Sequence, residues 1–78
     1  MTIAEALGRG VRAERARLGL QQDALAEAVG KSRAWVGAVE RGATNVGLGD
    51  VLALASALEA SLATLLRDAD DDDLRTLF

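Results

Sequence analysis

Apolar residues recur at intervals of three and four positions along most of the chain, which is the spacing of amphipathic helices. The first such segment predicts a helix from about Ile3 to Leu18. Its apolar stripe contains Leu7, Val11 and Leu18. Thr2 is the expected N-cap, because a threonine hydroxyl can accept a hydrogen bond from an unpaired N–H group of the first turn. No segment shows the alternation typical of a strand, so the pattern favours an all-helical fold.

Two short helical patterns flank a tight turn in the stretch 19–42, GLQQDALAEAVGKSRAWVGAVERG. The first begins at Gln22 and stops at Gly30, because glycine readily takes the left-handed conformation that ends a helix. After the turn, Ser32 is a suitable N-cap for a second helix over about residues 33–41. This arrangement predicts a helix-turn-helix motif.

The second half of the chain predicts two more helices, the first over about residues 48–58. The positions expected on its core side are Leu48, Val51, Leu52, Ala55 and Leu58. Leu54 is expected to point elsewhere, and Ser61 to cap a short fifth helix. Together these segments predict a compact, all-α, five-helix domain over residues 1–67, followed by an acidic tail over residues 68–78.

The composition supports this fold and excludes several kinds of chemistry. Half of the residues are hydrophobic, yet only Trp35 and Phe78 are aromatic, and the chain has no proline, which is typical of an all-helical domain. The chain contains no cysteine and no histidine, which excludes disulfides, the usual zinc ligands and thiol or imidazole catalysis. We therefore expect a protein that is not an enzyme and that needs no metal or cofactor.

The net charge of −3 is unevenly distributed along the chain. Residues 1–42 hold seven basic and five acidic side chains, a net charge of +2, whereas residues 43–78 hold two and seven, a net charge of −5. The first half can therefore present a locally positive surface to phosphates despite the negative total. The aspartates of the tail lack the glycine and the closing glutamate of a calcium-binding loop, so no calcium site is expected.

The predicted helix over residues 33–41 has two dissimilar faces. Val36 and Val39 lie on one side, which is expected to face the core. The candidate base contacts on the other side are Arg33, Ala34, Gly37 and Ala38. Small side chains allow a helix to sit deep in a DNA major groove, and Arg33 could donate paired hydrogen bonds to the O6 and N7 atoms of guanine. The alternative is that the small residues serve helix packing and the arginines are merely solvated.

A second set of side chains is expected to contact DNA phosphates. Its members are Gln22, Lys31, Ser32, Trp35 and Arg41. Gln22 opens the first motif helix, where unpaired amides and the helix dipole favour a phosphate oxygen. Lys31 and Arg41 flank the second motif helix and would position it without specifying sequence. Trp35 lies between the two faces, so its ring either covers the core margin or reaches a phosphate through its indole N–H.

Two opposite charges are predicted to point inward. Arg15 lies four residues beyond Val11 on the stripe of the first helix, and Glu40 lies beside Val36 on the core side of the second motif helix. A lone buried charge would be strongly unfavourable, so we expect Arg15 and Glu40 to form an ion pair. The alternative is two independently solvated side chains.

These motifs resemble the phage-repressor type of helix-turn-helix, the Cro/CI or XRE class, whose usual pattern is close to GLTQ-x-x-LA-x-x-x-G-x-S-x-x-x-IS-x-IE-x-G-x-x-NP. The matching residues are Gly19, Leu20, Gln22, Leu25, Ala26, Gly30, Ser32, Val36, Val39, Glu40, Gly42 and Asn45. The likeness continues to about residue 67 and implies a lambda-repressor-like DNA-binding domain that acts as a transcriptional regulator. The run Arg33-Ala34-Trp35-Val36 is also similar to the Arg-Thr-Tyr-Ile of small members that control restriction-modification genes. The chain departs from the pattern at Val46, where proline is usual.

The resemblance also implies dimerisation through the C-terminal helices, which are rich in leucine. The predicted interface residues are Leu54, Leu62, Leu65, Leu66, Leu74, Leu77 and Phe78. The alternative for the leucines of these helices is simple packing in the core. We therefore expect a homodimeric repressor that reads an inverted repeat in double-stranded DNA. The alternative is an adaptor or antitoxin that binds a protein partner through its leucine-rich half. No signal peptide or uninterrupted apolar span is evident, which predicts a cytoplasmic protein with no membrane contact.

Overall fold

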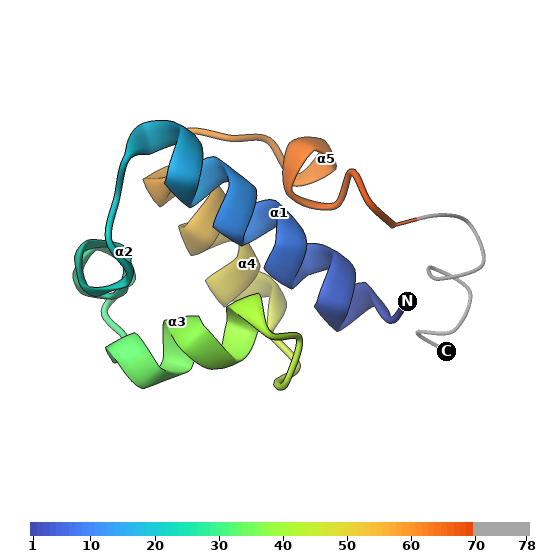
Figure 1. Cartoon of the computed structure of the whole chain (residues 1–78), viewed down its shortest axis with the longest axis horizontal. Helices are drawn as coiled ribbons and strands as arrows, with labels where there is room; N and C mark the ends of the chain where they lie inside the picture. Colours follow the sequence, from blue (N-terminus) through green and yellow to red (C-terminus); the bar gives the residue numbers. More distant parts are fainter. Residues whose placement is uncertain (70–78) are drawn as a thin grey trace.

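The structure is a computed structural model that describes residues 1–69, and five α-helices form in that part of the chain. Their bounds are α1 Ile3–Leu18, α2 Gln22–Val29, α3 Arg33–Glu40, α4 Leu48–Ala57 and α5 Leu62–Leu65. Helix α1 crosses the molecule, with α3 on one side of it, α5 on the other and α4 behind (Figure 1). Helix α2 lies at one end and contacts α3 and α4. The predicted all-α, five-helix fold is therefore confirmed.

The helix ends follow the local sequence. Thr2 and Glu5 form a capping box at the start of α1, in which the Glu5 amide donates to the Thr2 hydroxyl over 3.1 Å and the Thr2 amide donates to the Glu5 carboxylate over 2.7 Å. Hydrogen bonds from the backbone and the side chain of Thr2 to the Glu5 carboxylate lower the pKa of Glu5 below its usual value. Gly30 ends α2 with φ of +71°, a conformation that suits glycine. This turn sets the angle between α2 and α3.

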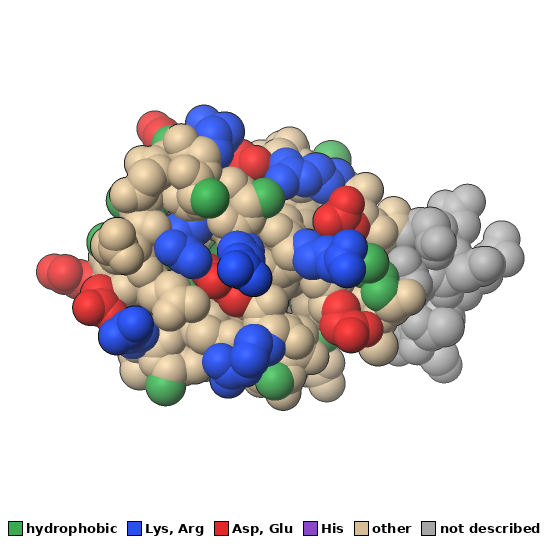
Figure 2. Space-filling model, in the orientation of Figure 1, with side chains coloured by type: hydrophobic (Ala, Val, Ile, Leu, Met, Phe, Trp, Pro, Cys, Tyr) green, Lys and Arg blue, Asp and Glu red, His purple; other side chains and the backbone are tan. Residues whose placement is uncertain are grey.

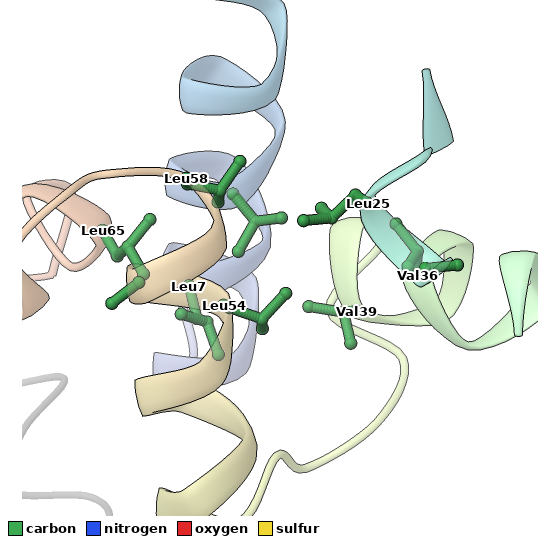
Figure 3. Close-up of a cluster of buried hydrophobic side chains, with 10 residues drawn as sticks. Leu7, Leu25, Val36, Val39, Leu54, Leu58 and Leu65 are labelled. Carbon is green, nitrogen blue, oxygen red and sulfur yellow. The ribbon is translucent and has the colours of Figure 1, made fainter. Parts of the chain in front are cut away.

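The core lies where the first four helices meet, with α5 closing one side. The largest fully buried side chains are Val11, Leu25, Val36, Val39, Leu54, Leu58 and Leu65. Figure 3 shows side chains of this cluster converging from all five helices. Burial of a leucine or valine side chain contributes about 1.5–3 kcal/mol, so each of these residues stabilises the fold substantially.

Two glycines let neighbouring elements approach α1 closely. A Cβ atom on Gly8 would lie 2.4 Å from the carbonyl oxygen of Val39 in α3. A Cβ atom on Gly10 would lie 1.8 Å from the carbonyl oxygen of Leu65 in α5. Any larger residue would force these backbones apart. The glycines that weaken α1 as an isolated helix therefore permit its packing against α3 and α5.

The predicted core face of α4 was wrong in part: Ala55 and Leu58 are buried and Val51 packs against the core as predicted, but three leucines differ from the prediction. Leu54 is fully buried, whereas Leu48 is 70% exposed and Leu52 is 52% exposed. Helix α4 carries apolar residues on nearly every side, so their spacing does not define which face is buried. Leu54 and Leu65 were also predicted in the dimer interface, but both are buried in the chain's own core and are unavailable to a partner.

The predicted interface residues Leu62 and Leu66 are half-buried at the surface. Leu74, Leu77 and Phe78 lie outside the described residues, as does most of the acidic tail. No helix within residues 1–69 is both long enough and apolar enough to cross a membrane. In the same part of the chain, no cluster of acidic side chains has the composition of a metal site.

A buried carboxylate ties the residues that follow α5 to α1. Glu14 accepts a hydrogen bond from Arg67 Nη1 over 2.9 Å and another from Arg17 Nε over 2.8 Å. The hydrogen bonds from Arg67 and Arg17 hold the pKa of Glu14 below its usual value, so the carboxylate stays ionised. The sequence reasoning missed Glu14, although its position three residues after Val11 places it on the buried side of α1.

Candidate nucleic-acid interface

Helix α3 is fixed to the core through one face. The Ser32 hydroxyl caps it by accepting a hydrogen bond from the Trp35 amide over 3.0 Å. Val36 and Val39 are buried against the other helices. The opposite face, which begins with Arg33 and Ala34, is therefore held toward solvent. Ser32 serves as the helix cap in this structure, and its predicted phosphate contact stays a prediction.

The four predicted base contacts differ in accessibility. Arg33 and Ala34 are exposed, and Ala38 is half-buried. Gly37 is buried, and a Cβ atom at this position would lie 3.1 Å from Nη1 of Arg41. Gly37 therefore presents little surface of its own, and its predicted base contact stays a prediction. The first turn of α3, carrying Arg33 and Ala34, is the accessible part of the predicted base-reading face.

A network of charged and polar side chains holds α3 against α1 and α2. Arg15 Nε donates to Glu40 Oε2 over 2.6 Å, and Arg15 Nη2 donates to Glu40 Oε1 over 3.1 Å. The remaining Arg15 nitrogen donates to the carbonyl oxygen of Leu20 over 2.8 Å. The side chains of Arg15 and Glu40 are only 18% and 6% exposed. The hydrogen bond to Glu40 raises the pKa of Arg15, and the predicted ion pair is present in the structure.

Gln22 completes this network. Its side-chain nitrogen donates to Glu40 Oε1 over 3.1 Å, so Gln22 braces α3 through the same carboxylate that binds Arg15. Gln22 is half-buried at the start of α2, beside a shallow hollow of about 460 Å³ that Arg15, Asp23 and Arg33 also line. The structure therefore gives Gln22 a bracing contact, while its phosphate contact stays a prediction.

The remaining predicted phosphate contacts have intramolecular partners or lie at helix ends. Lys31 Nζ lies 3.4 Å from Asp50 Oδ2 and 5.4 Å from the centre of the Trp35 ring. Trp35 is half-buried and packs against the core, which agrees with the core-margin alternative for its ring. Arg41 is exposed at the C-cap of α3. Phosphate binding by these side chains stays a prediction.

Sequence reasoning also missed an ion pair between α2 and α3 at this surface. Asp23 Oδ1 lies 3.3 Å from Arg33 Nε, and both side chains are more than two-thirds exposed. Asp23 belongs to the first turn of α2 and Arg33 to the first turn of α3. The turn at Gly30 brings these two helix starts together. Spacing along a single sequence does not reveal such a contact, because it depends on the angle between the helices.

Basic side chains are spread across the surface formed by α1 and α3. Figure 2 shows several Lys and Arg side chains over these helices, with acidic side chains interspersed. Residues 1–42 supply seven basic and five acidic side chains to the molecule, a small positive excess. This face therefore combines an exposed helix start with basic groups that can meet phosphates.

Comparison with known proteins defines the family. The family described as "Helix-turn-helix domain" matches residues 6–69, which include all of the motif and most of the chain. The chain belongs to the helix-turn-helix domain family. This helix-turn-helix protein is 42% identical over 66 residues to control protein C.SmaI from Serratia marcescens, a match that covers 85% of this chain and 79% of the relative. The resemblance to DNA-binding transcriptional regulators of the XRE type is confirmed.

Solved structures agree with this assignment. The restriction-modification controller protein C.AhdI from Aeromonas hydrophila superimposes with a TM-score of 0.75 at 40% identity, over 80% of this chain and 94% of that one. The clp gene regulator ClgR from Corynebacterium glutamicum superimposes with a TM-score of 0.85 at 31% identity, over 99% and 82% of the two chains. These proteins are named as controllers and regulators rather than enzymes, which agrees with the prediction of a transcriptional regulator without enzymatic activity.

Proposed function

We propose that this helix-turn-helix protein binds an inverted-repeat operator as a homodimer, reads it through α3, and represses transcription from the bound DNA. The observation that carries the proposal is the braced, outward-facing start of α3. Arg15 and Gln22 hold Glu40 at the far end of that helix, while Arg33 at its first turn is exposed. A preorganised helix start is suited to base recognition, because side chains near the N-terminus of such a helix contact base edges in the major groove.

Arg33 is the proposed base-reading residue. Its guanidinium presents donors that match the O6 and N7 acceptors of guanine, a pairing that discriminates among bases. Ala34 and Ala38 are suited to contact with thymine methyl groups. Lys31 and Arg41, which flank α3, would neutralise phosphates and set its position on the duplex. Binding should therefore weaken steeply as the salt concentration rises.

The proposed dimer forms around an apolar groove between the start of α1, α4 and α5. This groove has a volume of about 910 Å³, and its lining includes Ile3, Val46, Leu48, Leu62 and Leu66. Leu48 is mostly exposed in the single chain, so a second copy would cover apolar surface that is otherwise in contact with water. The proposed interface therefore keeps Leu62 and Leu66 from the sequence prediction and adds Leu48.

A two-fold dimer would place two copies of α3 in successive major grooves, roughly 34 Å apart. Such a dimer needs a DNA site with matching two-fold symmetry. A protein bound across a promoter excludes other proteins from the same surface, which is the physical basis of the proposed repression. The likeness to a restriction-modification controller makes the promoter of such an operon the first natural DNA to test.

The proposal is tested by selecting bound duplexes from a random pool with the wild type, Arg33→Ala and Arg12→Ala. Arg12 is an exposed arginine of α1, so Arg12→Ala removes the same charge as Arg33→Ala but leaves α3 unchanged. We expect the wild type to enrich an inverted repeat and Arg33→Ala to relax one symmetric base pair of it. Arg12→Ala should keep every base preference. A folded wild type that enriches no sequence at low salt would refute operator recognition.

A protein-binding adaptor or antitoxin is the second candidate function, and the apolar groove beside Leu48 favours it. Such a protein would use the groove for a partner of another kind and would need no base-reading arginine. Arg33→Ala separates the two functions, because an adaptor working through α4 and α5 should tolerate this substitution. The outcome to look for is unchanged partner binding by Arg33→Ala together with no sequence preference in the wild type.

A further inference from the structure

Asp23 and Arg33 form an ion pair across the helix-turn-helix. The Asp23 carboxylate oxygen lies 3.3 Å from Arg33 Nε, and the two side chains are 73% and 71% exposed. An ion pair that is so exposed contributes little to folding stability. Figure 2 shows acidic side chains beside a basic one at the end of the molecule where α2 and α3 meet. The pair therefore lies at the proposed DNA surface without being needed for the fold.

The geometry of the pair bears on how Arg33 can meet a base. The closest approach of the carboxylate is to Nε, and the Arg33 side chain is 71% exposed, so its guanidinium stays accessible to a DNA base. Paired hydrogen bonds to guanine O6 and N7 need two N–H donors of a planar guanidinium in a fixed orientation. A carboxylate partner that restrains the guanidinium reduces the conformational freedom lost when such a contact forms.

The negative charge of Asp23 favours the base contact of Arg33 but repels DNA phosphates. The start of α2 offers unpaired amides and the positive end of a helix dipole, which attract phosphate of any sequence. Asp23 places a negative charge in this first turn. The same carboxylate competes with phosphate oxygens for Arg33. The charge at the start of α2 weakens phosphate contacts with any duplex, whereas the competition for Arg33 weakens only contacts that lack a correctly placed guanine.

We propose that Asp23 is a specificity-determining positioning residue, which orients Arg33 toward guanine and opposes phosphate contacts made without it. This inference rests on the proposed function, because it assumes that Arg33 reads a base. In this role, Asp23 increases the ratio of the affinity for the operator to the affinity for other DNA.

The test compares the wild type with Asp23→Asn on two duplexes of equal length, the selected inverted repeat and a shuffled sequence of the same composition. Asp23→Asn removes the charge while keeping the size of the side chain. We expect the ratio of operator to shuffled-DNA affinity to fall about fivefold, partly through tighter binding to the shuffled duplex. Glu27→Gln is the matched control, because Glu27 is exposed one turn later on α2 and loses the same charge. The control should keep the wild-type ratio.

A double variant shows whether Asp23 acts through Arg33. In an Arg33→Ala background, adding Asp23→Asn should leave the ratio unchanged, because the residue being oriented is gone and the lost phosphate repulsion at the start of α2 affects both duplexes alike. The loss of preference in Asp23→Asn should also be confined to the base pair that Arg33→Ala relaxes. A general effect on folding would not move one base pair alone.

The outcomes separate the inference from the function on which it rests. If the wild type prefers the inverted repeat and Asp23→Asn behaves like Glu27→Gln, the role of Asp23 is refuted and operator recognition stands. If Asp23→Asn lowers the ratio equally with and without Arg33, Asp23 acts as a general charge and the positioning role is refuted. If the wild type binds both duplexes equally, the proposed function fails and the inference fails with it.

Discussion

Glu40 shows how a single carboxylate can position the second helix of the motif. It accepts hydrogen bonds from Arg15 on α1 and from Gln22 on α2, so the far end of α3 is tied to both preceding helices. The pair could be predicted because each charge occupied an apolar stripe of its own helix, where an isolated charge would be unfavourable. The contacts of Glu14 with Arg67 and of Asp23 with Arg33 could not be predicted. Glu14 and Arg67 are separated by 53 residues in the sequence, and Asp23 lies on an exposed surface.

We expect Glu40→Ala to lower the free energy of unfolding by about 3 kcal/mol, because it leaves Arg15 largely buried without its anionic partner. Urea denaturation followed by circular dichroism measures this change. Glu27→Ala removes an exposed carboxylate of α2 and should change stability by less than about 0.5 kcal/mol. A double variant, Arg15→Met with Glu40→Leu, should lose less stability than Glu40→Ala alone. Equal stability of Glu40→Ala and the wild type would contradict the role of the network.

At the scale of the helices, capping and glycine signals allowed α1, α2 and α3 to be predicted closely. Thr2, Gly30 and Ser32 end or begin these helices through hydrogen bonds and backbone conformations that depend on neighbouring residues only. The buried face of α4 could not be predicted in the same way. Leu48 and Leu54 are chemically identical, and their burial is decided by where α1 and α5 lie rather than by local sequence.

Gly10 gives a test of close packing between α1 and α5. We expect Gly10→Ala to lower the free energy of unfolding by about 2 kcal/mol, because the added methyl group overlaps the carbonyl oxygen of Leu65. Gly49→Ala is the control, since a Cβ atom at Gly49 of α4 meets no other group and should stabilise the helix by about 0.5–1 kcal/mol. Thermal denaturation of both variants measures the difference. A Gly10→Ala protein as stable as Gly49→Ala would contradict the packing described for α1.

At the scale of the whole molecule, the leucines separate into a core set and a surface set. Leu54 is fully buried, and Leu54→Ala should lower the free energy of unfolding by about 2–5 kcal/mol. Leu48 lies at the apolar groove, and Leu48→Asp should leave the fold intact while preventing dimer formation. Sedimentation equilibrium measures the mass of each folded variant. A wild type that is monomeric at all accessible concentrations, or a Leu48→Asp protein that still dimerises, would refute the proposed interface.

The central claim is that Arg33, carried by a braced α3, reads a guanine in each half of a symmetric site. Methylation of guanine N7 on the selected operator tests this most directly, because the methyl group blocks one of the two acceptors that the arginine needs. We predict that methylating one guanine in each half-site abolishes binding by the wild type, and that Arg33→Ala becomes insensitive at those two positions. Wild-type binding that survives methylation of every guanine in the site would contradict it.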